Sequence, residues 1–131
     1  MKNTIYKKGE VIIEEGSLST GAFIIESGRV EVSKKLPNGK SQVISILERN
    51  DIFGEMGLID QLPRSATVRA LEDSSISIMT PDNFNLLAKR NPQALMPILK
   101  VLATRLRNTL KILEEIDEQE PRNQAAVAGS I

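Results

Sequence analysis

Two patterns of hydrophobic positions divide the chain near residue 80. Before that point, short apolar runs alternate with turn residues, and two of them have the period of a half-buried strand. In one, Val30 and Val32 are expected to face inward and their polar neighbours outward; in the other, Ile76 and Ile78 alternate with serines. The pattern predicts strands over residues 11–13, 22–26, 29–36, 42–47, 67–71 and 75–79.

Turn residues separate these runs. Pro37-Asn38-Gly39 stands between two of the predicted strands, and Asn-Gly tolerates the positive φ that tight hairpins need. Glycines punctuate other turns, for instance at Gly16 and Gly28. Several short strands at this spacing are typical of a barrel or sandwich. The first part of the chain, about residues 5–80, is therefore predicted to be β.

The second part is predicted to be helical. Thr80 is a candidate N-cap with Pro81 at the first helical position, and a short helix can run from 81 to about 90. Asn91-Pro92 ends it, and a longer helix is expected over about 92–119. Pro97 must either lie in the first turn of that helix or kink it. Residues 121–131 show no clear periodicity and are expected to form a flexible tail.

The long helix carries an apolar seam. Its positions recur at alternating steps of four and three, the a/d pattern of a coiled coil, and they are Leu95, Leu99, Leu102, Leu106, Thr109, Leu113 and Ile116. A shorter stripe on a neighbouring face consists of Met96, Ala103 and Leu110. Because two apolar faces need two partners, we expect a homodimer through residues 95–116. The alternative is that the whole stripe packs on its own domain, as most amphipathic helices do.

Composition excludes several classes of function. The 131 residues include no Cys and no His, which removes thiolate chemistry, the Ser-His-Asp triad and the usual zinc sites, and no metal site is expected. Lys plus Arg equals Asp plus Glu at 17 each, and aromatic residues are only 3%, so no basic or stacking surface for nucleic acid is predicted. The N-terminus lacks the apolar region of a signal peptide, and no apolar run approaches a membrane span. We expect a cytoplasmic protein.

One segment, residues 53–68, has the chemistry of an anion site. Gly54 and Gly57 let backbone approach a ligand closely, and a short helical turn over 55–59 can aim free N–H groups at an anion. Arg64 can make charge-assisted contacts to phosphate, and Glu55 can accept a hydroxyl proton. Taken singly, each of these features is more common in ordinary turns and solvated ion pairs. Spacing and composition alone indicate only a β domain with helices.

The same segment resembles a known motif. FGEMGLI at 53–59 and PRSATV at 63–68 are similar to the phosphate-binding cassette of the cyclic nucleotide-binding domain family, as in catabolite activator protein and the regulatory subunits of cyclic-AMP-dependent kinase. YKKGEVI at 6–12 and AFIIESGRV at 22–30 look like the opening strands of that family. The resemblance covers about residues 5–116. It implies a mainly β fold, a double-stranded β-helix of jelly-roll type, followed by a short helix and a long dimerisation helix, all within residues 1–120.

The resemblance also implies roles for residues in the cassette. Contacts to the ribose 2′-OH are expected from Gly54 and Glu55, and contacts to the cyclic phosphate from Arg64, Ser65 and Ala66. One departure is Asn50-Asp51, where the family often has Gly before the Asp. Because Asn visits the left-handed region more readily than most residues, the turn is expected to survive.

Contacts to the base are implied outside the cassette. Ser45 lies on the strand that lines the base slot in the bacterial members, and Arg105 and Thr109 match an Arg and a Thr four residues apart that meet the adenine across the dimer. Thr109 is also the polar position of the predicted seam. This match favours cyclic AMP over cyclic GMP, although Ser65 is compatible with either.

The function implied is a cyclic-nucleotide sensor that does no chemistry and switches its C-terminal helix on binding. Two alternatives stay open: a dimerising interaction module with a vestigial pocket, and the ligand-binding fragment of a larger regulator such as a transcription factor. Bacterial transcription factors of the family continue into a helix-turn-helix domain. Nothing of that kind follows the long helix in these residues, so no direct contact of this chain with nucleic acid is expected.

Overall fold

The computed structural model describes residues 2–119, and the side chains of residues 2–115. The predicted flexible tail, 121–131, lies outside the described residues. The chain forms two units, residues 1–93 and the segment from residue 94 onward, and each is described by itself.

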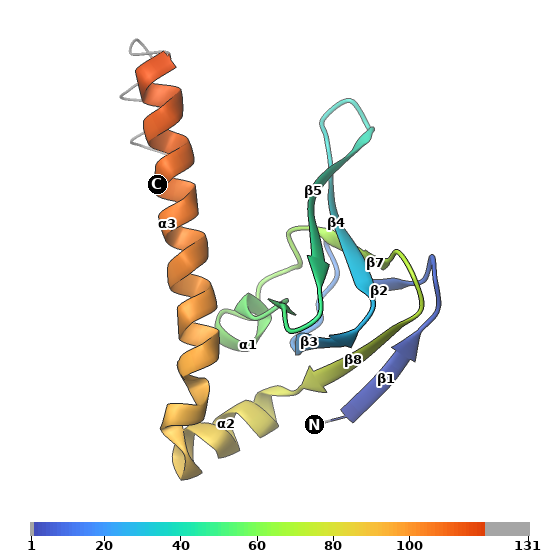
Figure 1. The fold of residues 1–131 in the computed structure, drawn as a ribbon, viewed down its shortest axis with the longest axis vertical. Coiled ribbons are helices and arrows are strands. Elements are labelled where there is room, and N and C mark those ends of the chain that lie inside the picture. Colours follow the sequence, from blue (N-terminus) through green and yellow to red (C-terminus); the bar gives the residue numbers. More distant parts are fainter. Residues whose placement is uncertain (1, 120–131) are drawn as a thin grey trace. The chain divides into compact units, whose positions relative to one another are not determined.

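The first unit contains two four-stranded antiparallel sheets (Figure 1). One has the order β1-β8-β3-β6 and the other the order β2-β7-β4-β5. The strands are β1 (Lys2–Tyr6), β2 (Val11–Ile13), β3 (Ala22–Ser27), β4 (Arg29–Lys35), β5 (Ser41–Glu48), β6 (Ile52–Phe53), β7 (Thr67–Ala70) and β8 (Ser74–Met79). The predicted mainly β fold is confirmed, as two open sheets rather than a closed barrel. Strands β4 and β5 form the hairpin that extends beyond the other strands in Figure 1.

Apolar residues from both sheets form one core. Its fully or nearly buried members are Ile13, Phe23, Ile25, Val30, Phe53, Val68 and Ile76. Val30 is buried and Val32 packs partly buried against the cluster, which confirms the inward face predicted for this strand. Ile76 is likewise buried, but the serine face of β8 is not simply solvated: Ser77 is buried and its hydroxyl donates to Glu26 Oε1 at 2.8 Å. Strand β8 lies between β1 and β3, so its polar side chains need partners within the sheet.

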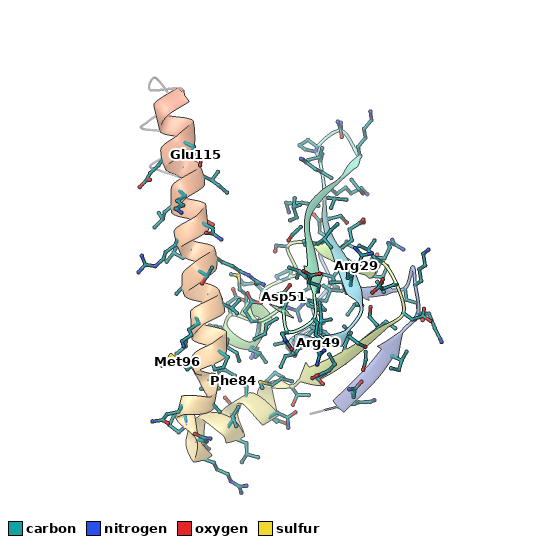
Figure 2. All side chains as sticks on the ribbon, in the orientation of Figure 1. Arg29, Arg49, Asp51, Phe84, Met96 and Glu115 are labelled. Carbon is teal, nitrogen blue, oxygen red and sulfur yellow. The ribbon has the colours of Figure 1, made fainter. Side chains whose placement is uncertain are left out.

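The turn before β6 depends on a left-handed residue. Asn50 has φ +74°, and its N–H donates to the Ile25 carbonyl at 2.8 Å. The next residue, Asp51, is labelled in Figure 2. Its carbonyl accepts the Ile25 N–H at 3.0 Å, and its carboxylate accepts the Glu48 N–H at 2.9 Å. The expectation that Asn maintains this turn is confirmed. The turn leads the chain directly into the cassette.

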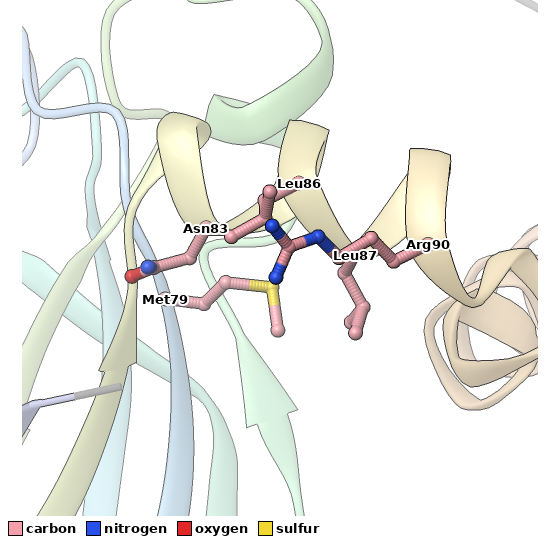
Figure 3. A pocket seen from close by; sticks show the side chains of 5 residues that line it. All are labelled: Met79, Asn83, Leu86, Leu87 and Arg90. Carbon is pink, nitrogen blue, oxygen red and sulfur yellow. The ribbon is translucent and has the colours of Figure 1, made fainter.

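Two helices belong to the first unit. Helix α1 (Met56–Ile59) is the short turn predicted within the cassette. Helix α2 (Pro81–Arg90) is capped by Thr80, whose hydroxyl accepts the Asn83 N–H at 3.2 Å. A small apolar hollow lies between this helix and the end of β8 (Figure 3), and its lining residues are Met79, Asn83, Leu86, Leu87 and Arg90. It includes none of the residues predicted to bind a ligand.

The described part of the second unit is helical. A short 3-10 turn (Pro92–Leu95) precedes α3 (Met96–Gln119), and Pro97 is the second residue of α3. Pro97 therefore lies in the first turn, where its missing N–H costs nothing. Two seam residues, Leu99 and Leu106, are 54% and 58% exposed in the single chain. The side chain of Ile116 lies outside the described residues, and the dimer stays a prediction.

Candidate functional site

The centre of the cassette is a buried arginine. Arg64 is only 7% exposed, and its guanidinium makes three hydrogen bonds at 2.6–2.8 Å. Nη1 donates to the Gly54 carbonyl, Nη2 to the Gly21 carbonyl and Nε to the Ser19 hydroxyl. Planar guanidinium donors in this arrangement fix both the position and the plane of the group. The structure therefore joins the predicted phosphate residue to the backbone of Gly54, a predicted ribose residue.

Both glycines of the cassette lie close to this arginine. A Cβ on Gly57 would lie 2.6 Å from Arg64 Nη1 and 2.9 Å from its Cζ. A Cβ on Gly54 would lie 3.1 Å from the same Nη1, and Gly54 also has φ +72°. The guanidinium thus occupies the space that a side chain would fill in α1 and in the residue before Glu55. The sequence predicted that the backbone at these two glycines lies close to a ligand. In the structure it lies close to the guanidinium of Arg64.

A pair of stacked aromatic rings lies next to the guanidinium. Phe23 of β3 and Phe53 of β6 stack with ring centroids 5.0 Å apart and an interplanar angle of 8°. Arg64 Cζ lies 5.9 Å from the centroid of Phe23, within reach of a cation–π attraction. These two rings are half of the four aromatic residues of the chain. They hold the cassette on the core.

The site contains two buried ionisable side chains, Arg64 and Glu55. Glu55 is 1% exposed at the start of α1. Burial lowers the pKa of Arg64 from its ordinary value, while the carboxylates of Glu55 and Asp60 act in the opposite direction. An arginine remains protonated at any physiological pH, so the pocket holds a fixed cation with a carboxylate close by. Such a pair matches a phosphate anion and a neighbouring hydroxyl donor.

The second arm of the cassette is held by the loop after β2. The Arg64 carbonyl accepts the Gly16 N–H at 2.7 Å, and the Arg64 N–H donates to the Ser17 carbonyl at 2.9 Å. One residue further on, the Ser65 carbonyl accepts Lys34 Nζ at 2.8 Å. The backbone on which three predicted phosphate contacts depend is therefore fixed from outside the motif.

The remaining predicted site residues fall into two groups. Ser45 is exposed on β5 and is paired with Val32 of β4. Its side chain therefore lies on the same face of the sheet as Val32, which packs against the core. Arg105 and Thr109 lie on α3, where the Thr109 hydroxyl donates to the Arg105 carbonyl at 2.9 Å. Since α3 belongs to the second unit, their contact with the base stays a prediction.

Sequence reasoning missed three contributors to the site. Ser19, Gly21 and Lys34 all contact the cassette, and none of them lies in the motif. Two of the contacts use backbone carbonyl oxygens, which carry no signal in the residue type. Only Lys34 had a usable signal, because it continues the inward alternation of Val30 and Val32 with a charged residue.

Comparison with known proteins settles the family. The model of the cyclic nucleotide-binding domain matches residues 4–91. The chain belongs to the cyclic nucleotide-binding domain family. The match contains the whole cassette and most of the strands that support it.

Relatives of two kinds share this domain. The chain is 29% identical over 124 residues to the cyclic AMP receptor protein of Thermus thermophilus, covering 95% of this chain and 57% of that protein. It is 34% identical over 87 residues to the cAMP-dependent protein kinase regulatory subunit of Yarrowia lipolytica, covering 66% of this chain and 22% of the relative. The chain thus spans little more than half the length of the first of these relatives and about a fifth of the second.

A solved structure has the same fold. The crystal structure of the Thermus thermophilus catabolite activator protein superposes with a TM-score of 0.85 at 28% identity, covering 93% of this chain and 57% of that one. The predicted resemblance to catabolite activator protein and to kinase regulatory subunits is confirmed.

Two further properties concern the described residues alone. Among the side chains of residues 2–115, no three of the metal-binding types gather into a group that could hold a metal ion. Within residues 2–119, none of the helices combines the length and apolar character needed to cross a lipid bilayer.

Proposed function

We propose that this cyclic nucleotide-binding domain is a cytoplasmic sensor of cyclic AMP that performs no chemistry of its own. The observation that carries the proposal is the buried Arg64, held in one plane by Gly54, Gly21 and Ser19 beside the carboxylate of Glu55. A guanidinium has more N–H donors than these three contacts use. We assign the others to the cyclic phosphate, together with the Ser65 and Ala66 backbone and the Ser65 hydroxyl.

We assign the ribose to Glu55 and Gly54, which are joined to Arg64 by the hydrogen bond from Arg64 Nη1 to the Gly54 carbonyl. Glu55 accepts the 2′-OH proton, and the Gly54 backbone lies beside it. Because the Gly54 carbonyl already accepts Arg64 Nη1 at 2.7 Å, ribose and phosphate contacts are coupled through one short link. A ligand that lacks the cyclic phosphate loses the contacts at one end of this link, and a ligand that lacks the 2′-OH loses the contact at the other end.

The adenine preference rests on the second unit. Arg105 and Thr109 lie one helical turn apart on α3, which suits a pair of groups that meet one base. We infer that the helix dimerises through the seam at residues 95–116 and closes over the base of the bound ligand. By linkage, ligand binding alters an output only if the two helix positions bind it differently.

Two other functions make different predictions. A dimerising module with a vestigial pocket dimerises but binds no nucleotide; Arg64 and Glu55, both present and both buried, argue against it. The ligand-binding part of a larger regulator binds nucleotide equally well, and the relatives that are longer than this chain favour it as the setting of the sensor.

Calorimetric titration of the wild-type chain tests the proposal. Four ligands are compared: cyclic AMP, cyclic GMP, 2′-deoxy cyclic AMP and 5′-AMP. We expect cyclic AMP to bind most tightly, the deoxy ligand at least about tenfold more weakly because a hydrogen bond to a charged group is lost, and 5′-AMP not measurably. Absence of heat with both cyclic nucleotides supports the vestigial pocket. Tighter binding of cyclic GMP overturns the assigned base preference alone.

A further inference from the structure

We propose that Lys34 is a positioning residue for the ligand phosphate, holding the Ser65–Ala66 peptide in its binding orientation from the neighbouring strand. The inference rests on the proposed function, since it names a residue outside the cassette that prepares the same phosphate site. Lys34 is not among the residues that the cassette motif contains.

Lys34 lies at the end of β4 on the inner face of its sheet. It follows Val30 and Val32 at the two-residue period of a strand, and both valines direct their side chains to the core. Lys34 is the next position on this face, and its neighbour there is the cassette rather than the apolar core. There the ammonium group lies 2.8 Å from the Ser65 carbonyl oxygen.

Glu15 fixes the lysine in this place. One carboxylate oxygen lies 3.5 Å from Lys34 Nζ, and the other accepts the Lys35 N–H at 2.9 Å. The Glu15 N–H in turn donates to the Thr67 hydroxyl at 3.0 Å. The pKa of Glu15 is lowered, mainly by its bond to the Lys35 backbone and further by the charge of Lys34, so the carboxylate is ionised at neutral pH.

These contacts surround a single peptide unit. Residue 64 is held by the backbone of Gly16 and Ser17, residue 67 by Glu15, and the carbonyl between residues 65 and 66 by Lys34. In a planar trans peptide the C=O and N–H bonds point in opposite directions. Lys34 therefore sets the direction of the Ala66 N–H, one of the predicted phosphate donors.

The same contact strengthens that donor. A cation on the carbonyl oxygen polarises the amide, so its N–H becomes more positive and binds an anion better. The ammonium also adds a favourable charge near the phosphate. The Lys34 side chain is 51% exposed, and screening by solvent limits the effect to about fivefold in affinity, the upper end for an exposed charge pair.

The test compares two lysines. Lys34→Met removes the charge and the contact, and Lys40→Met removes the same charge from the turn between β4 and β5. Lys34→Arg keeps a cation that can reach the carbonyl. Each variant is titrated calorimetrically with cyclic AMP, and its thermal unfolding is measured without ligand.

We expect the Kd of Lys34→Met to rise about fivefold, with Lys40→Met near wild type, Lys34→Arg restoring most of the loss and all four proteins unfolding cooperatively. Equal affinities for the two methionine variants overturn the inference while the proposed function stands. A wild type that binds no cyclic nucleotide overturns the proposed function, and the inference with it. If Lys34→Met lowers the unfolding temperature but not the affinity, Lys34 is structural only and the inference is wrong.

Discussion

The cassette and helix α3 treat their functional residues in opposite ways. In the cassette, Arg64 and Glu55 are 7% and 1% exposed, and the arginine has protein acceptors on three of its nitrogens. On α3, Leu99 and Leu106 are more than half exposed in the single chain. Arg64 is buried and hydrogen-bonded, whereas Leu99 and Leu106 expose apolar surface to water.

This difference fits the proposal that one chain binds the phosphate by itself and dimerises through its long helix. A buried charge is tolerated only where it is hydrogen-bonded, and Arg64 makes its three hydrogen bonds with residues of its own unit. An exposed leucine seam gains its free energy only on association. We therefore expect variants of the two regions to separate ligand affinity from dimerisation.

The largest effect is expected on α3. Leu106→Glu places a charge at the centre of the predicted seam in both protomers, and should raise the dimer Kd at least about a hundredfold, because each buried leucine contributes about 1.5–3 kcal/mol. Sedimentation equilibrium measures the change.

The matched control is Thr104→Glu, an exposed position two residues away on the opposite side of the helix. It adds the same charge and should leave the dimer intact. Dissociation by both variants, or by neither, contradicts the seam at 95–116.

A smaller but more informative effect is expected at Gly57. In Gly57→Ala the new Cβ collides with the guanidinium of Arg64, whose hydrogen bonds then cannot all persist. We expect cyclic AMP affinity to fall about thirtyfold, equivalent to roughly 2 kcal/mol for a displaced charged hydrogen-bonding group.

Met56→Ala, an exposed neighbour in α1, is the control and should bind as wild type does. If Gly57→Ala binds normally, the guanidinium is not needed in its observed position. The dimer Kd of Gly57→Ala should equal that of wild type, because the substitution changes the cassette and not the seam.

A smaller effect than at Gly57 is expected at Glu55. Glu55→Gln keeps the size of the side chain and one acceptor oxygen but removes the charge, so affinity should fall about tenfold. Discrimination against 2′-deoxy cyclic AMP should shrink in the same variant. A discrimination equal to that of wild type would place the ribose contact elsewhere.

Much of the fold was predictable because its signals are local. The alternation at Val30 and Val32, the Thr80 cap and the turn at Asn50 all depend on neighbouring residues, and all are confirmed. Strands β1 and β6 were not predicted. One is a polar edge strand and the other contains only two residues, so neither has enough apolar residues to show a period.

Only part of the site was predictable from the sequence. The motif named Glu55 and Arg64, and the structure buries both. It could not name Ser19 or Gly21, because their contacts with Arg64 join residues more than 40 positions apart and one is made by a carbonyl. Residue type records what a side chain can donate, but not which backbone oxygen will accept it.

Titration of Arg64→Ala with cyclic AMP tests the central claim most directly. Arg64→Lys, which keeps the charge but not the planar fork, is titrated beside it, and circular dichroism checks that both variants are folded. We expect no measurable binding to the alanine variant, at least about a hundredfold weaker than wild type, and an intermediate loss for lysine. A folded alanine variant that binds cyclic AMP within about twofold of wild type, less than the loss of any charged hydrogen bond, would contradict this claim.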